Sequence, residues 1–264
     1  MNTTDAIRKD ILRMVHASKS SHVGSCLSSV EILYTLYFRV MKIDPTKPDA
    51  FGNDRLILSK AHASAALYAT LAARGFFDRR LLDKFCQNDG TLPCHTIRRI
   101  VPGVETSGGS LGHGLPIGLG MCIGLKSFNS PSRIFVIMSD GECEEGSTWE
   151  AAMLASTLKM DNLTAVVDFN KLQAFGRTNE IVDMRNLAER WRVFGWDVSE
   201  CDGHDVVQLE SALSRSRERP KMVIAHTVKG KGVSFMEDRL EWHYKSPNDD
   251  ELRRAMEEID SRGR

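Results

Sequence analysis

The sequence has no excess of charge of either sign, because 35 lysines and arginines balance 35 aspartates and glutamates. A balanced chain lacks the basic surface that holds nucleic acid or a membrane surface, so neither class of partner is expected. Long apolar runs are missing as well. The longest stretch without these four charged residue types, Thr106 to Leu125, contains His113, Pro116 and several glycines. No membrane span is therefore predicted.

Features of a secreted protein are also missing. Residues 1–15 carry acidic and basic side chains where a secretory signal would have its apolar core, so no signal segment is expected. The six cysteines include no CxxC pair, and we expect them to stay reduced. Cys26 and Cys122 have small and apolar neighbours, as buried thiols usually do. These observations predict a cytoplasmic protein.

Hydrophobic patterns predict one α/β domain over residues 1–264. The chain, with 42% hydrophobic residues, is long enough to bury a large core. Apolar runs typical of buried strands occur at 55–59, 134–138, 163–169, 196–198 and 222–226. Helical patterns occur at 3–15, 28–39, 61–74, 78–87, 114–126, 147–158 and about 247–259, the last with Ser246 as its cap and Pro247 in its first turn. This alternation predicts a parallel sheet flanked by helices on both faces, with 88–110 as a loop.

Polar residues follow two neighbouring strands of this sheet where each strand ends. Asp140 and Gly141 follow the strand at 134–138, and Asn170 follows the strand at 163–169. Folds of this kind bind ligands at the carboxyl ends of their strands. A carboxylate, an amide oxygen and a main-chain carbonyl could hold Mg²⁺, and Gly141 would let a diphosphate approach the backbone. The alternative is that these residues form only a turn and a strand end, which is common.

Two other groups of residues admit more than one interpretation. The segment Gly108 to Gly112 matches G-x-S-x-G, the nucleophile elbow of serine hydrolases, with Ser110 as nucleophile. That elbow needs an apolar strand directly before the serine, and residues 102–107 form a poor one. Loop histidines are either solvated or bind a polar, hydroxyl-rich or phosphorylated substrate. Those in or beside predicted loops are His22, His62, His95, His113, His204 and His243.

Seven short segments, taken in order, carry a family resemblance. They are SKSSHVGS (18–25), DRLILSKAHAS (54–64), GVETSGGSLGHG (103–114), SDGECEEG (139–146), VDFNKLQAFG (167–176), CDGHD (201–205) and HTVKGKGVSF with WH (226–235, 242–243). Over about residues 5–255 the chain resembles the amino-terminal, diphosphate-binding domain of transketolase. The resemblance implies the thiamin diphosphate-binding fold of that domain. One departure is His113, which stands where the family commonly has glutamine.

The resemblance also implies roles for individual residues. Mg²⁺, or another divalent cation such as Ca²⁺ or Mn²⁺, would be bound by Asp140, Asn170 and the carbonyl of Leu172. The residues expected at thiamine diphosphate are Ser25, His62, Gly109, Ser110, Leu111, Gly141, Asn170, Lys229 and His243. The histidines expected to act in catalysis along the sugar channel are His22, His62, His95 and His243. Glu145 matches an acidic residue near the family's dimer interface.

The implied function is transfer of a two-carbon ketol unit from a ketose to an aldose, both of them sugar phosphates by family default. A full-length transketolase also has a pyrimidine-binding domain and a C-terminal domain, for which this chain has no counterpart. We therefore expect a separate subunit that supplies both, in a heterotetramer with two copies of each chain. The alternatives are a non-catalytic protein that binds thiamine diphosphate, the diphosphate-binding subunit of a 2-oxo acid dehydrogenase, a deoxyxylulose phosphate synthase and a serine hydrolase.

Overall fold

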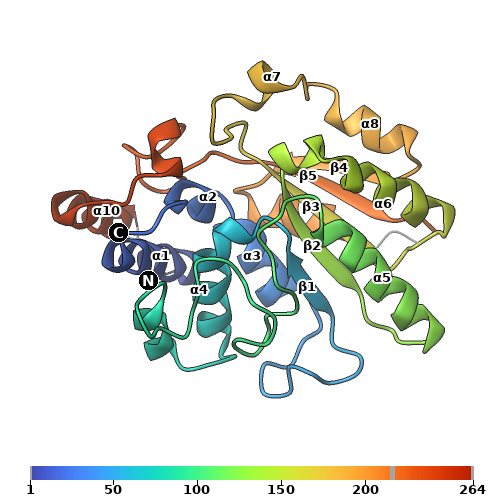
Figure 1. Ribbon diagram of the computed structural model, residues 1–264, viewed down its shortest axis with the longest axis horizontal. Helices are drawn as coiled ribbons and strands as arrows, with labels where there is room; N and C mark the ends of the chain where they lie inside the picture. Colours follow the sequence, from blue (N-terminus) through green and yellow to red (C-terminus); the bar gives the residue numbers. More distant parts are fainter. Residues whose placement is uncertain (1, 215–217, 263–264) are drawn as a thin grey trace.

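Five parallel strands form a single sheet at the centre of the computed structural model, which describes residues 2–214 and 218–262 (Figure 1). The strands are β1 (Arg55–Leu58), β2 (Ile134–Ser139), β3 (Leu163–Phe169), β4 (Asp197–Asp202) and β5 (Lys221–His226). Their order across the sheet is β1-β2-β3-β5-β4, and each neighbouring pair is parallel. All side chains of β2 and β3 are buried, as expected for central strands of a parallel sheet. The predicted α/β fold is confirmed.

Helices cover both faces of the sheet. The helices are α1 (Thr3–Ser18), α2 (Val23–Ser28), α3 (Val30–Thr35), α4 (Ser64–Arg74), α5 (Gly114–Ser127), α6 (Gly146–Thr157), α7 (Thr178–Ile181), α8 (Leu187–Val193), α9 (Val206–Ala212) and α10 (Asp249–Arg262). Short 3₁₀ turns lie at Ala61–Ala63, Arg79–Lys84, Gly141–Glu144 and Leu240–His243, and a π-helical turn lies at Leu36–Val40.

Alternate side chains of β2 divide the core in two. Phe135 and Ile137 belong to a cluster with residues of α1, α2, α3, α4 and α9. Ile134, Val136 and Met138 belong to a second cluster with residues of α5, α6 and α8. This division follows from the two-residue period of a strand, which turns successive side chains to opposite faces.

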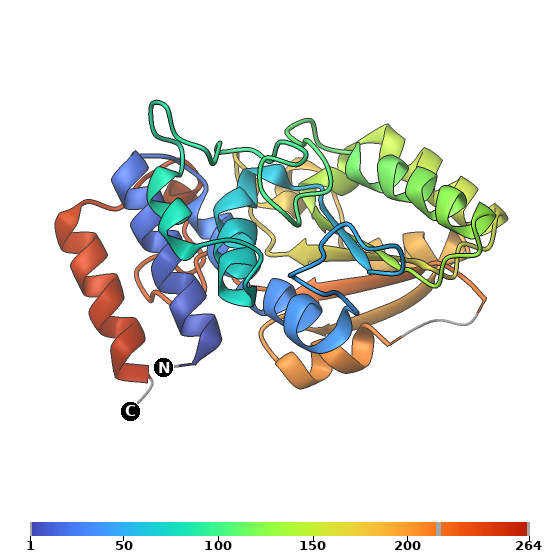
Figure 2. The same ribbon diagram turned by 90° about the horizontal axis from the view of Figure 1, so that it is seen from below.

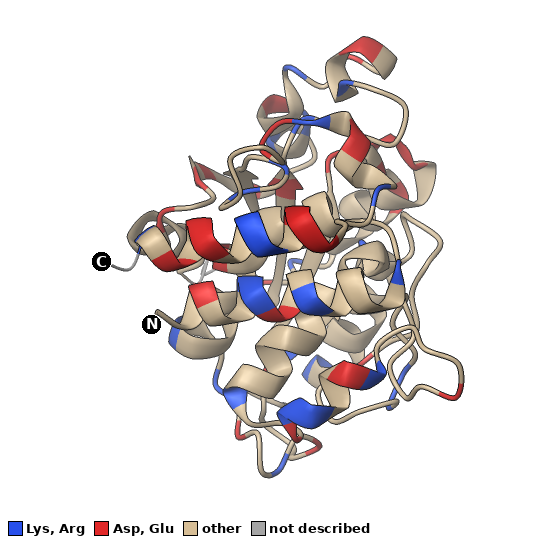
Figure 3. Ribbon diagram, turned by 90° about the vertical axis from the view of Figure 1, so that its left-hand side faces the viewer, with Lys and Arg blue, Asp and Glu red and all other residues tan. Residues whose placement is uncertain are grey.

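Helix α10 lies beside α1, at the side of the molecule away from β4 (Figure 2). Lys9 of α1 forms an ion pair with Asp260 of α10. On this side, acidic and basic residues are interspersed along both helices rather than gathered by sign (Figure 3). The mixture agrees with the balanced charge of the sequence.

Two predicted helices at the ends of the chain have different caps. The first, α1, begins at Thr3 as predicted and follows Asn2, whose side chain makes no capping hydrogen bond. The last begins at Asp249 rather than at 247, because Asn248 caps it: Asn248 Oδ1 accepts from the Glu251 amide, and the Glu251 carboxylate accepts from the Asn248 amide, both at 2.9 Å. Ser246 instead donates to the carbonyl of Val15.

Several internal boundaries also differ from the predictions. The helix expected at 28–39 is interrupted, because α2 ends at Ser28 and α3 runs only to Thr35 before a π-helical turn. The helix expected at 78–87 is a 3₁₀ turn at Arg79–Lys84. Strand β4 is longer than the expected 196–198, and α7, α8 and α9 were not predicted.

No helix within residues 2–214 and 218–262 has both the length and the apolar content needed to cross a membrane. All six cysteines are free thiols, and Cys26 and Cys122 are buried as predicted.

Candidate functional site

The carboxyl ends of three central strands bring the predicted metal ligands together. Ser139 of β2 lies opposite Asp168 of β3, and Phe169 of β3 lies opposite His226 of β5. The next residues of β2 and β3, Asp140 and Asn170, therefore leave the sheet side by side at one edge. This is the position where parallel sheets bind ligands.

The turn from Asn170 to Leu172 packs against Asp140, so the predicted ligands lie close together. The carboxylate of Asp140, 2% exposed, accepts from the amides of Gly141 at 2.9 Å and Lys171 at 2.8 Å. The side-chain oxygen of Asn170 accepts from the amide of Leu172 at 3.1 Å. The predicted oxygen ligands are thus the Asp140 carboxylate, the side-chain oxygen of Asn170 and the Leu172 carbonyl. Oxygen ligands of these kinds fit a small, hard divalent cation.

The charge of Asp140 also suits a cation. Burial raises the pKa of Asp140, although hydrogen bonds from Thr178 and the two amides oppose this shift. A bound divalent cation would favour the ionised carboxylate and offset the cost of burial. Within the described parts of the chain, no three His, Cys, Asp or Glu side chains gather as a metal site of their own.

A cavity of about 390 Å³ opens beside this turn. Nine residues named in the sequence analysis line it: Ser25, His62, Leu111, Asp140, Gly141, Glu145, Asn170, Leu172 and His243. Glu145 is the residue directly before α6. Residues from widely separated segments thus converge on one space.

Four histidines form a cluster, and two of them, His62 and His243, line the cavity. The ring of His22 lies 5.2 Å from that of His62, 6.1 Å from that of His95 and 5.0 Å from that of His243. Burial, followed by the charge of neighbouring groups, lowers the pKa of His22 to about 4 and that of His243 to about 3. The pKa of His62 is also well below its usual value for the same reasons. These three rings are neutral at physiological pH, so each can accept a hydrogen bond.

Lys229 connects the histidines with the turn. Its ammonium donates to the carbonyl oxygen of Leu172 at 2.9 Å and to Nδ1 of His243 at 2.8 Å. Burial, and next the charge of Lys60, lowers the pKa of Lys229 to about 8. Lys229 therefore supplies positive charge at the position expected for an anionic cofactor group.

The glycine-rich segment divides between two cavities. Gly109 and Ser110 line a separate cavity of about 240 Å³, whereas Leu111 lines the one beside Asp140. His113 also lines the 240 Å³ cavity, whereas His204 lines neither cavity and contacts the amide of Val228. Residues 102–110 contain no strand, so the structural setting of a nucleophile elbow is absent around Ser110. The serine hydrolase interpretation is thus not supported.

A buried ion pair beneath the site was not assigned from the sequence. Lys60 and Asp168 have fully buried side chains and bind each other. Ser28 donates to the Asp168 carboxylate at 2.6 Å, and Thr227 donates to it as well. The sequence did contain a signal for this pair. Lys60 directly follows one predicted strand and Asp168 lies within another, and a charge buried among apolar neighbours needs a partner.

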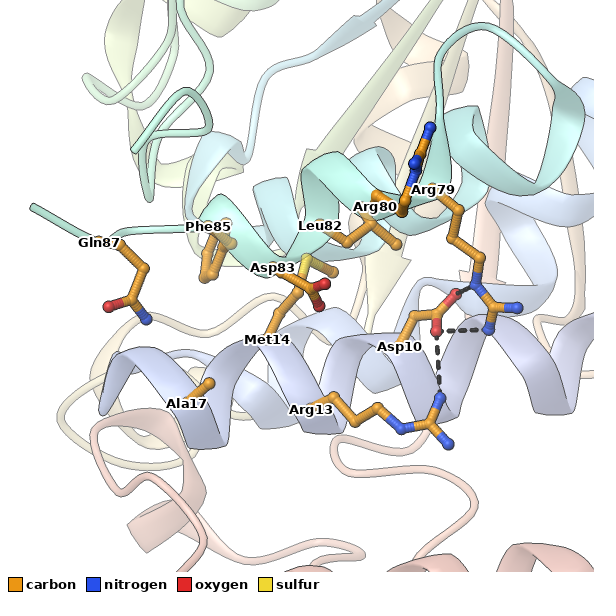
Figure 4. A pocket seen from close by; sticks show the side chains of 10 residues that line it. All are labelled: Asp10, Arg13, Met14, Ala17, Arg79, Arg80, Leu82, Asp83, Phe85 and Gln87. Atoms are coloured by element: carbon orange, nitrogen blue, oxygen red, sulfur yellow. Dashed lines mark hydrogen bonds and ion pairs between the residues drawn. The ribbon is translucent and has the colours of Figure 1, made fainter. Parts of the chain in front are cut away.

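Another cavity, of about 330 Å³, lies between α1 and the turn at Arg79–Lys84 (Figure 4). Its main charges are already paired, because Asp10 binds both Arg79 and Arg13. None of the predicted site residues lines it. The cavity beside Asp140 is therefore the candidate functional site.

Comparison with known proteins points to the same site. The family description "Transketolase, thiamine diphosphate binding domain" matches residues 1–260. The chain is 39% identical over 259 residues to an apulose-4-phosphate transketolase subunit of Phocaeicola vulgatus, covering 97% of this chain and 92% of that protein. It is 40% identical over 262 residues to the 6-deoxy-6-sulfo-D-fructose transketolase subunit SqwG of a Clostridium species, covering 98% and 95%.

A solved structure agrees with these sequence matches. The transketolase of Pichia stipitis, solved with sedoheptulose 7-phosphate, superposes with a TM-score of 0.92 at 27% identity. The superposition covers 98% of this chain but 40% of the Pichia chain. The predicted family and its fold are confirmed, which favours them over the dehydrogenase and deoxyxylulose phosphate synthase alternatives. The chain belongs to the transketolase family and is of the kind of subunit that carries the thiamine diphosphate-binding domain.

Proposed function

We propose that the chain, as one domain over residues 1–264, is the N-terminal subunit of a split, thiamine diphosphate-dependent transketolase. The observation that carries the proposal is one cavity lined by Asp140, Asn170 and Leu172 together with His62 and His243, whose rings cluster with those of His22 and His95. The two relatives described above are named as transketolase subunits and are similar over nearly their whole lengths.

Under this proposal the turn binds the anionic end of the cofactor. Asp140, Asn170 and the Leu172 carbonyl would hold Mg²⁺, or Ca²⁺ or Mn²⁺ in its place. Lys229 would balance the charge of the diphosphate, and Gly141 has no side chain to separate its backbone from it. The remaining proposed contacts are Ser25, His62, Leu111 and His243, which line the cavity, and Gly109 and Ser110, which line the separate one. When bound, thiamine diphosphate supplies the carbanion that adds to a carbonyl and stores the electron pair left by carbon–carbon cleavage.

The imidazoles would manage the protons. Ketol transfer takes a proton from a substrate hydroxyl when a carbon–carbon bond breaks and returns one when the new bond forms. His22 and His243 are neutral, so their rings can accept hydrogen bonds from the substrate hydroxyls that lose and regain these protons. His62 and His95 complete the group that would orient the hydroxyls of the sugar.

The metal assignment is tested by Asp140→Ala. Calorimetric titration of the chain with thiamine diphosphate and Mg²⁺ should show that this variant loses Mg²⁺-dependent binding, because it removes the carboxylate proposed to bind the metal. Asp183→Ala is a matched control that removes an exposed carboxylate paired with Arg185. Unchanged affinity of Asp140→Ala would refute the assignment.

The partner subunit would supply the pyrimidine-binding and C-terminal domains, in a heterotetramer. We propose that it covers α5 and α6, which lie side by side on one face (Figure 1). These helices expose Ile117, Ile123, Met153, Leu154 and Leu158. Lys126 is the first charged residue of α5, so most of that helix surface is uncharged. Glu145, at the start of α6, borders this face.

Co-purification tests the partnership. The chain should bind a second subunit from its own source, and ketol transfer should require both. Met153→Asp should weaken the complex, whereas Val193→Asp, a comparable change at an exposed residue of α8, should not. Ketol transfer by this chain alone would contradict the split enzyme. A stable complex without such transfer would favour a non-catalytic role.

The proposed substrates are a ketose donor and an aldose acceptor that carry phosphate, or sulfonate in its place. The relatives named above act on apulose 4-phosphate and on 6-deoxy-6-sulfo-D-fructose by their names. A cytoplasmic location, which would keep the six free thiols reduced, completes the proposal.

A further inference from the structure

Two backbone groups of the segment that carries Lys229 bind side chains behind the site. The amide of Val228 donates to Nε2 of His204 at 2.8 Å. The carbonyl of Lys231 accepts from Nε of Arg8 at 3.2 Å. His204 belongs to the CDGHD segment after β4, and Arg8 belongs to α1, so the Lys229 segment is held from both sides by distant parts of the chain.

A single carboxylate joins these two side chains. Glu31 of α3 binds Nδ1 of His204 through Oε2 at 3.0 Å and Arg8 through Oε1 at 2.5 Å. The side chains of His204, Glu31 and Arg8 are only 13%, 8% and 8% exposed. Burial alone would raise the pKa of Glu31, but the hydrogen bond from His204 and the charge of Arg8 hold it below its usual value.

These contacts fix the tautomer of His204. A backbone amide can only donate, so Nε2 must be an unprotonated acceptor toward Val228. The ring proton is then on Nδ1, where the Glu31 carboxylate accepts it. The ring of His204 therefore links Glu31 to the backbone of Val228, the residue directly before Lys229.

The same segment has little freedom elsewhere. The amide of Gly230 donates to the carbonyl of Gly24 at 2.9 Å. Gly232 has a φ of +99°, and a Cβ there would lie 2.5 Å from Nε of Arg8. The backbone on either side of Lys229 is thus pinned, and its long side chain starts from a defined place when it reaches the Leu172 carbonyl.

We propose that Arg8, Glu31 and His204 form a positioning network that holds the Lys229 ammonium at the diphosphate site. His204 is the positioning residue that acts through Val228, and it touches neither cofactor nor substrate. The inference rests on the proposed function, because it takes Lys229 to face the diphosphate. It assigns a role to the CDGHD segment, which the proposed function leaves without one.

Two conservative variants separate the two hydrogen bonds of His204. In His204→Gln the amide oxygen can take the place of Nε2 and accept from Val228. In His204→Asn the shorter amide reaches the place of Nδ1 and can bind only Glu31. We expect His204→Asn to weaken thiamine diphosphate binding about tenfold at saturating Mg²⁺, as for the loss of one hydrogen bond, and His204→Gln to restore most of the affinity.

The assay is calorimetry on the full chain in complex with its co-purified partner, together with thermal unfolding without cofactor. His226→Ala is the matched control, because it removes a similar histidine–glutamate contact, to Glu200 at 3.1 Å, that does not bind Val228. It should leave cofactor affinity unchanged. Equal affinity of His204→Asn and the parent chain would overturn the proposal, as would equal losses of affinity and unfolding temperature in the Asn and Gln variants.

The tautomer provides a test that needs no variant. Long-range nitrogen–proton NMR of the parent chain should show the His204 proton on Nδ1, and a proton on Nε2 would overturn the network. The variant Lys229→Met distinguishes failure of the positioning network from failure of the proposed function. If it loses cofactor affinity while His204→Asn does not, only the network is wrong. If the parent complex itself does not bind thiamine diphosphate, the proposed function is wrong and the network, which rests on it, falls with it.

Discussion

Removal of one buried charge beneath the site should reveal how strongly the Lys60–Asp168 ion pair stabilises the fold. Both side chains are fully buried. Besides Asp168, the Lys60 ammonium binds only neutral groups, Ser29 Oγ at 3.1 Å and the Ser25 carbonyl at 3.2 Å, among the contacts found for it. Asp168→Asn keeps the shape of the side chain but leaves the ammonium buried without its counter-ion.

The expected cost follows from that burial. Breaking a buried pair by removing one partner costs about 3 to 5 kcal/mol. For a chain of this size the melting temperature should fall by roughly 6 to 20 °C, at about 2 to 4 °C per kcal/mol. Lys60→Met on the Asp168→Asn background removes the orphaned charge, so the double variant should be more stable than Asp168→Asn alone. A double-mutant cycle then isolates the interaction between the two side chains.

The assay is urea unfolding followed by circular dichroism, with the slope against denaturant held constant across the four proteins. Burial acts to raise the pKa of Asp168, but the charge of Lys60 and several hydrogen bonds lower it overall. The pair therefore stabilises the fold above the pKa of an unfolded aspartate, about 3.9, and loses this contribution as pH falls through the lower folded value. The difference between parent and Asp168→Asn should be constant near neutral pH. A cost below about 1 kcal/mol, or a double variant no more stable than Asp168→Asn, would refute the reasoning.

Three further predictions concern packing, capping and protonation. Gly118→Ala should lower stability by about 1 to 3 kcal/mol, because its Cβ would lie 2.7 Å from a methyl group of β2. Gly120→Ala meets nothing within 4 Å and should stabilise α5 by up to about 1 kcal/mol. Urea unfolding measures both effects. Asn248→Ala should cost about 1 kcal/mol in the same assay through loss of the α10 cap, and no change would contradict the cap. His22 and His243 bind protons less readily when folded, so stability should fall as pH decreases from about 6.5 toward 4, and ring titration by NMR near pH 6.5 would disprove their burial.

The parts of the fold that sequence predicts well are those where one local signal dominates. The central strands are continuous apolar runs, and α5 and α6 match their predicted ranges to within about one residue. Prediction fails where a distant contact decides. Helix α2 begins after His22, whose φ is 73° and whose amide donates to the carbonyl of His243. The serine-rich segment before His22 gives no local sign of that contact. Likewise, Ser246 offered a cap but instead binds Val15 across the α1–α10 contact.

The site shows the same division. Asp140 and Asn170 are predictable because each directly follows a recognisable strand, and the alignment of parallel strands places such residues together. The histidine cluster is not predictable from spacing, since His22, His95 and His243 come from three loops and meet only after folding. Family resemblance names these residues, but the separation of Ser110 from Leu111 into different cavities depends on the path of one loop.

Positive charge and neutral imidazole rings come from different residues at this site. Lys229, with a pKa of about 8, supplies positive charge that changes little just below neutral pH. His22 and His243 contribute almost no charge there, because their pKa values are about 4 and 3. An anion entering the cavity would meet an attraction from Lys229 that is independent of imidazole protonation. A modest acidification should consequently change the charge of neither Lys229 nor these two imidazoles.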